Sequence, residues 1–206
     1  MSPRPYQLGK REESVSRSRR RILDAARDLL RAAEAYPGFT VDAVAQRADV
    51  ARATVYYQFG SKTALLEAVC DDLADAGGMA GLAGVFTSPT AEEAIRGFIA
   101  AFAGFWAADR LVMRRLRALA ALDPDVGAVI DARDQRRREG LTVLASRLPE
   151  GAGPAAEEVV RTLFALTSFE TFDALAGPDR DLAAAVPAVT RLALAALTAA
   201  APDLPG

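Results

Sequence analysis

Hydrogen-bond donors of different reach are grouped in one short stretch of this 206-residue chain. Arg52 carries two parallel N–H groups that match the acceptors of a guanine in the major groove. Thr54, Tyr56 and Lys62 have the reach and the donors to hold backbone phosphates. As a helix, the segment from Arg52 to Gln58 is roughly 10 Å long and fits a major groove about 12 Å wide. The grouping predicts contact with duplex DNA.

A short helix, a tight turn and a second short helix are expected to position these side chains. Thr40 can cap the first helix, and Asp49 suits the turn because Asp tolerates left-handed backbone. In the second helix, which begins near Ala51, Val55 and Phe59 are spaced i, i+4 and can anchor one face to the core. Aromatic residues are more often simply core, but three successive aromatic or amphipathic positions cannot all face inward. The other faces then carry Arg52, Ala53, Thr54, Tyr56, Tyr57 and Gln58.

Three segments resemble the N-terminal domain of the TetR family of transcriptional regulators, over about residues 18–69: RILDAARDLL, FTVDAVAQRADV and ARATVYYQFGSKTALLEAV. The resemblance implies that the helix with TVYYQF enters the major groove and that Arg52, Ala53 and Tyr57 meet bases. Asp49 and Ala51 stand where the family usually has Gly and Ser, and a lost Ser cap costs about 1 kcal/mol. The residues implied to meet the DNA backbone are Thr40, Thr54, Tyr56, Gln58 and Lys62.

The composition indicates a folded chain of one or two domains with a substantial core, because 51% of the residues are hydrophobic. The longest uncharged apolar stretch, residues 97–108, is well below the ~20 residues needed to cross a bilayer. The N-terminal region also lacks the continuous apolar run of a signal peptide. We therefore expect a cytoplasmic protein without a membrane partner.

The charge of the chain is unevenly distributed although its net value is only −2. Residues 1–62 hold 12 Lys or Arg against 7 Asp or Glu, a net +5, and the remainder holds 13 against 20, a net −7. A basic N-terminal region followed by an acidic remainder favours DNA binding through the N-terminal region. For Arg4, Lys10 and Arg11, a solvated charge run at a terminus is an equally good interpretation.

The chain contains no histidine and one cysteine, Cys70. A structural zinc site or a Cys/His catalytic pair within one chain is therefore not expected, and no cofactor or metal is predicted. Cys70 lies among apolar residues and is interpreted as a small buried hydrophobe, with redox sensing as the alternative.

Helical periodicity runs along almost the whole sequence, which predicts an all-α fold with an N-terminal three-helix helix-turn-helix domain and a C-terminal helical domain. The expected parts are a basic arm over 1–17, the DNA-binding domain with its connecting helix over 18–76, and a ligand-binding and dimerisation domain over 77–206. Gly77 to Pro89 is interpreted as a flexible connection, and Pro187 as a possible kink. Helices are expected at 18–35, 61–76, 109–121, 123–148, 155–176 and 181–200, with another that begins at a capping box of Thr90 and Glu93.

The last two helices carry apolar residues that could form a dimer seam, as the resemblance implies for the C-terminal domain. A dimer would read two half-sites, whereas a lone helix reads one weakly. The alternative is that these residues only close the core of one chain. They are Leu163, Leu166, Phe169, Thr190, Ala193, Leu194 and Leu197.

An aromatic stripe in the C-terminal part could line the ligand pocket that the resemblance implies, although such stripes are more often plain core. The lack of His and the small number of charges around it favour an uncharged aromatic or aliphatic effector. The candidate lining is Phe98, Phe102, Phe105, Trp106, Met113, Phe164 and Phe172.

Two classes of function compete. The first is a homodimeric DNA-binding transcriptional repressor that a small apolar ligand releases from its operator. The second is a helical small-molecule enzyme or carrier whose helix-turn-helix-like head is incidental. The first hypothesis is preferred because Asp and Glu lie mostly at helix starts or on polar faces, where they do not converge as an acid and a base. An activator that binds DNA in the same way is a further alternative.

Overall fold

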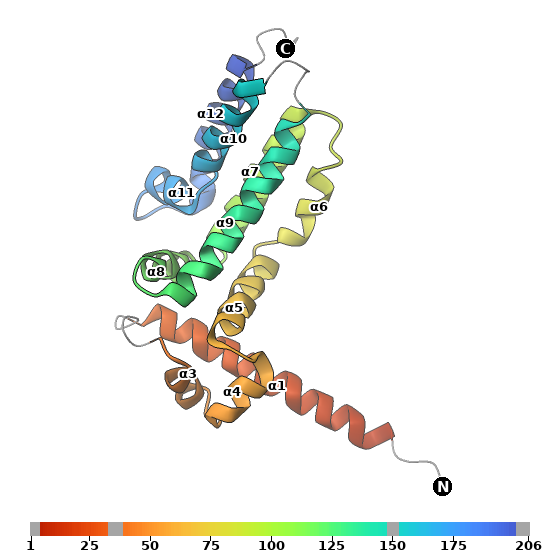
Figure 1. Ribbon diagram of the computed structural model, residues 1–206, viewed down its shortest axis with the longest axis vertical. Coiled ribbons are helices and arrows are strands. Elements are labelled where there is room, and N and C mark those ends of the chain that lie inside the picture. Colours follow the sequence, from red (N-terminus) through yellow and green to blue (C-terminus); the bar gives the residue numbers. More distant parts are fainter. Residues whose placement is uncertain (1–4, 33–38, 148–152, 201–206) are drawn as a thin grey trace. The chain divides into compact units, whose positions relative to one another are not determined.

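The computed structural model describes residues 5–32, 39–147 and 153–200, and every regular element in these ranges is a helix (Figure 1). The chain divides into two compact units. One unit combines residues 1–71 with 114–129, and the other combines 72–113 with 130–206. The α+β and all-β classes are thereby excluded for the described residues, and the predicted all-α class is confirmed.

The first unit contains α1 (Pro5–Arg31), α3 (Val41–Arg47), α4 (Arg52–Phe59) and most of α5 (Lys62–Ala76). The expected start of the first helix near Ser18 is wrong, because α1 already begins at Pro5 and includes most of the basic arm. Proline suits a first helical turn, and the residues that follow are mostly good helix formers. The Tyr36-Pro37-Gly38 break lies outside the described residues.

The core of this unit comes from apolar residues at helical spacing on α1, α3, α4 and α5. Ile22 and Leu30 of α1 are fully buried, and Val44 of α3 is buried as well. Arg115 of α8 (Arg110–Ala120) donates to the carbonyl oxygens of Leu30 and Ala32 at the end of α1. The core and this cap fix the position of α1, against which α3 packs.

The second unit is a bundle of longer helices. It includes α7 (Ala91–Ala107), part of α8, most of α9 (Pro124–Ala145), α10 (Gly153–Leu166), α11 (Phe169–Ala176) and α12 (Val186–Ala200). The expected single helix over 155–176 is interrupted at residues 167–168 because Ser168 accepts a hydrogen bond from the Thr171 N–H and caps α11. Pro187 falls in the first turn of α12, where proline is tolerated, after the short η2 (Leu182–Ala185).

The segment between α5 and α7 is more regular than expected. It forms η1 (Met79–Gly81) and α6 (Leu82–Val85), so the interpretation as a flexible connection is wrong. At its start, a Cβ on Gly77 would lie 2.5 Å from Phe105 Cα, and a Cβ on Gly104 would lie 2.5 Å from the Gly77 oxygen. The missing side chains therefore allow the backbone after α5 to contact α7.

Leu182–Ala199, which covers η2 and most of α12, is long and apolar enough to cross a membrane by length and composition alone, with a mean hydropathy of 1.7. Sequence analysis missed this stretch because Arg191 interrupts it. Val189, Ala193 and Leu197 on one face of α12 are buried, and α12 packs against α10 and α7. This packing accounts for the third of the stretch that is buried.

Candidate nucleic-acid interface

The turn between α3 and α4 has the backbone that the sequence predicted. Thr40 caps α3 by accepting from the Ala43 N–H at 3.1 Å. Asp49 has a φ of 52° and is the one residue other than glycine with positive φ in the described chain. Arg21 of α1 donates to the Ala48 and Asp49 carbonyl oxygens, the latter at 2.9 Å. The turn is thus held from α1, which sequence analysis did not foresee.

Helix α4 is anchored by Val55 and Phe59, which are 1% and 9% exposed. The predicted anchors are confirmed. Tyr56 and Tyr57 are 39% and 77% exposed, so the tyrosines point away from the core as expected. Arg52 and Ala53 are exposed too, and Thr54 and Gln58 are half-buried. The face of α4 opposite its anchors is therefore open to a ligand as large as a duplex.

Arg52 is positioned before any DNA arrives. Its guanidinium lies 3.1 Å from the Asp42 carboxylate of α3, donates to the Tyr56 hydroxyl at 3.3 Å, and lies 5.5 Å from the centroid of that ring. The hydrogen bond to Tyr56 and the charge of Asp42 raise the pKa of Arg52. Asp42 lies in the first turn of α3, and the sequence did not identify it as a partner of Arg52. Its ten-residue separation from Arg52 offers no periodic signal.

The C-terminal end of α4 is clamped by α1. Arg19 donates to the Gln58 carbonyl oxygen at 3.2 Å and its guanidinium lies 4.3 Å from the centroid of the Phe59 ring. The Gln58 side chain donates to the Val15 carbonyl oxygen at 3.4 Å. Gln58 was expected to meet the DNA backbone, and here its amide ties α4 to α1.

Lys62, the first residue of α5, was also expected to meet a phosphate. Its ammonium contacts the carboxylate of Asp123 and lies 3.6 Å from that of Asp125. Partial burial acts to raise the pKa of Asp123, but the bond and charge of Lys62 and the N–H groups of Val126 and Asp125 outweigh it and lower that pKa. Lys62 would have to exchange these carboxylates for a phosphate.

The predicted pocket residues lie in the interior of the second unit. The rings of Phe98 and Phe102 are 4.7 Å apart between centroids, and those of Phe105 and Trp106 are also 4.7 Å apart. Met113 is buried as well. Fully buried Phe172 and half-buried Phe164 complete the set. The rings thus pack against one another inside this unit.

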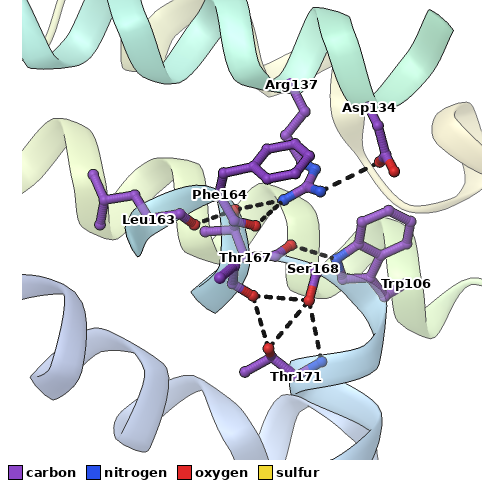
Figure 2. A network of polar contacts seen from close by, with 9 residues as sticks. Trp106, Asp134, Arg137, Leu163, Phe164, Thr167, Ser168 and Thr171 are labelled. Carbon is purple, nitrogen blue, oxygen red and sulfur yellow. Dashed lines mark hydrogen bonds and ion pairs between the residues drawn. The ribbon is translucent and has the colours of Figure 1, made fainter. Parts of the chain in front are cut away.

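The expected scarcity of charge in this region is wrong, because Arg137 is 3% exposed and lies 3.9 Å from the centroid of the Phe164 ring. It donates to the Phe164 carbonyl oxygen at 2.6 Å and to Thr167 Oγ1 at 2.9 Å, and it pairs with Asp134 at 3.3 Å. Trp106 Nε1 donates to the Thr167 carbonyl oxygen (Figure 2). These bonds stabilise the junction of α10 and α11.

Most residues of the predicted dimer seam are buried within one chain and pack between its own helices, so they cannot form an exposed seam. Leu166 and Leu194 are half-buried. On α12 a large apolar side chain that is exposed is instead Leu192, at 51%. The buried members are Leu163, Phe169, Thr190, Ala193 and Leu197.

The anchored α4, the left-handed turn and the outward arginine and tyrosines define a helix-turn-helix DNA-binding protein. Residues 22–69 match the family described as bacterial regulatory proteins of the tetR family. Residues 22–69 thus form a DNA-binding domain of the TetR type, and the chain is a DNA-binding transcriptional regulator.

Solved structures agree with this fold. A transcriptional regulator from Rhodococcus sp. Rha1 is 21% identical with a TM-score of 0.65, over 91% of this chain and 99% of that one. A TetR-like regulator from Rhodococcus sp. RHA1 is 22% identical with a TM-score of 0.60, over 88% and 96%. A TetR-family regulator from Mesorhizobium loti is 18% identical with a TM-score of 0.55, over 90% and 96%. No curated protein sequence gives a significant match.

Proposed function

We propose that the protein is a cytoplasmic repressor that binds a two-fold symmetric operator as a homodimer and leaves it when a small effector binds. The observation that carries the proposal is the outward face of α4, where Arg52, Tyr56 and Tyr57 are exposed while Val55 and Phe59 anchor the helix. In this proposal Arg52, Ala53 and Tyr57 meet bases. The DNA backbone is bound by Thr40, Thr54, Tyr56, Gln58 and Lys62.

An exposed stripe on α12 supports the homodimer and replaces the buried seam. Ala188, Leu192, Ala195 and Ala199 follow at intervals of three or four residues, and all are exposed except half-buried Ala188. The small alanines permit the close approach of a second helix. An isologous contact of α12 with α12 of a second copy would bring two α4 helices to one operator.

Effector release requires that the ligand prefer a conformation in which the two reading helices are wrongly spaced for DNA. A ligand with equal affinity for both conformations would shift nothing. The protein is proposed to act by binding, without catalysis. Repression rather than activation is the simpler output, because occupancy of a promoter is sufficient for it.

Selection of bound sequences from random duplex DNA tests the function directly. The expected result is an inverted repeat with half-sites centred about 34 Å apart. Failure to enrich any sequence at low ionic strength would contradict DNA binding.

The oligomeric state is tested by sedimentation of Leu192→Glu. This variant should be a monomer and lose affinity for the inverted repeat. The matched control is Leu111→Glu, because Leu111 is 42% exposed on α8 and lies outside the stripe. An unchanged dimer in Leu192→Glu would rule out the stripe as the interface.

A further inference from the structure

A cavity of about 430 Å³ lies between α9 and α10 of the second unit, and none of its lining residues belongs to the predicted aromatic stripe. Its volume is within the range of small-molecule sites, roughly 300–1,000 Å³. The buried side chains of Ala145 and Val160 give it an apolar floor. The lining residues are Arg138, Thr142, Ala145 and Ser146 from α9, and Ala156, Glu157, Val160 and Arg161 from α10.

The cavity has a positive charge at its edge. Arg138 contributes one guanidinium from α9, and Arg161 contributes another from α10. Glu157 is the one carboxylate in the lining, and it lies 3.8 Å from Arg161 with both side chains mostly exposed. An exposed ion pair of this kind contributes little free energy, so Arg161 can exchange Glu157 for another anion.

Arg138 is the more unusual of the two cations. Its guanidinium lies 4.0 Å from the centroid of the Phe164 ring, which holds it in place. Among the residues that the structure describes, no carboxylate pairs with this guanidinium and no oxygen accepts from it. A half-buried cation is therefore fixed beside an apolar cavity with its hydrogen-bond donors available.

The hydroxyl groups of the lining do not add donors. Thr142 Oγ1 donates to the Arg138 carbonyl oxygen at 3.0 Å, and Ser146 Oγ donates to the Val143 carbonyl oxygen at 2.8 Å. Both hydroxyl protons are thus used within α9. The donors that face a ligand are guanidinium N–H groups, which bind carboxylates with two parallel hydrogen bonds.

We propose that this cavity binds an organic carboxylate with a small apolar body, such as an aryl-alkanoate or a medium-chain fatty acid. The carboxylate would lie between Arg138 and Arg161, and the apolar body would cover Ala145 and Val160. Phe164 connects this cavity with the buried network, because Arg137 and Arg138 both lie on its ring, at 3.9 and 4.0 Å. A ligand that draws Arg138 away changes the packing at the junction of α10 and α11.

Calorimetric titration of the full chain without DNA tests the site. The probes are 4-phenylbutyrate and decanoate, and the matched neutral probes are their primary amides. We expect each carboxylate to bind about tenfold more tightly than its amide, as one charge-assisted interaction provides. No binding of either carboxylate, or equal binding of acid and amide, would overturn the proposal.

Variants then locate the site. Arg138→Gln and Arg161→Gln should each weaken 4-phenylbutyrate about tenfold. Arg96→Gln is the matched control, since Arg96 forms an exposed ion pair with Glu92 on α7 and should leave binding unchanged. Circular dichroism checks folding. If Arg138→Gln does not fold, Arg161→Gln decides alone because Arg161 is 62% exposed, and unchanged affinity in that variant overturns the site.

The role of this ligand as the effector rests on the proposed function and is measured separately. Added to the complex with the selected operator, 4-phenylbutyrate should release DNA from the wild-type protein but not from Arg161→Gln. Binding in calorimetry without release from DNA would contradict the effector role and support the site. Failure to bind any operator would contradict the proposed function alone.

Discussion

Arg52 on α4 and Arg137 on α9 have the same kinds of partner in opposite surroundings. Arg52 is 3.1 Å from a carboxylate, contacts a tyrosine and has a side chain 59% exposed. Arg137 is 3.3 Å from a carboxylate, contacts a phenylalanine and has a side chain 1% exposed. Because Arg52 is exposed to water, it can exchange its carboxylate partner for a DNA base at little cost in free energy. Arg137 is buried, so water cannot replace its partners when they are lost.

Replacement of Arg137 by alanine is expected to have the largest effect. It removes the donor to the Phe164 carbonyl oxygen and to Thr167 Oγ1, together with one partner of Asp134, which should lower the free energy of unfolding by about 3–5 kcal/mol. Urea denaturation measures this, with exposed Arg96→Ala as the control. A loss below about 1 kcal/mol would mean that the buried and exposed arginines do not differ as proposed.

Tyr57→Ala tests the exposed side of the comparison. Because Tyr57 is 77% exposed, the free energy of unfolding should change by no more than about 0.5 kcal/mol. Operator affinity, measured by fluorescence anisotropy, should fall about tenfold. Val55→Ala on the buried face should instead lower stability. The interpretation is wrong if Tyr57→Ala destabilises the fold as much as Val55→Ala does.

The turn that carries the reading helix can be tested at Asp49. Its φ of 52° disfavours a residue with a plain Cβ, so Asp49→Ala should cost about 1 kcal/mol of unfolding free energy. Asp49→Gly is the control and should be at least as stable as the wild type in urea, because glycine adopts positive φ without strain. An equal loss of unfolding free energy in both variants would mean that the missing carboxylate, and not the backbone conformation, causes the loss.

The smallest effect is expected at Asp123, which holds Lys62. Its lowered pKa means that the pair stabilises the fold fully above the unfolded pKa of about 3.9, and that this stability is lost as the pH falls through the folded pKa. Asp123→Asn should therefore cost up to about 1 kcal/mol at pH 7 and much less in acid. Urea denaturation across pH checks this, and a pH-independent difference would exclude the ion pair as its cause.

The reading helix was largely predictable because its signals are local. The i, i+4 anchors Val55 and Phe59 and the turn residue Asp49 follow from spacing and backbone preference. The contact of Lys62 with Asp123 joins residues 61 positions apart and has no local signal. Likewise, the contact of Arg52 with Asp42 has no local signal, because it forms only when α3 and α4 pack together.

The second unit was less predictable for a related reason. Arg137 lies within the charged run DQRRRE, where a solvated face is the natural expectation, yet it is buried. Ser168 follows the end of α10 and caps α11, within an apolar segment whose sequence predicts one continuous helix. The dimer seam was predicted from apolar residues such as Ala193 and Leu197. These side chains are buried in the core of the chain and are therefore not exposed to a second copy.

The central claim is that the outward face of α4 reads bases through Arg52. The most direct measurement is the affinity of wild type and Arg52→Ala for the selected operator and for every single-base variant of one half-site. We predict that Arg52→Ala loses about 1–3 kcal/mol and its preference at one base pair, while its non-specific binding persists. An unchanged preference at every position would contradict the claim.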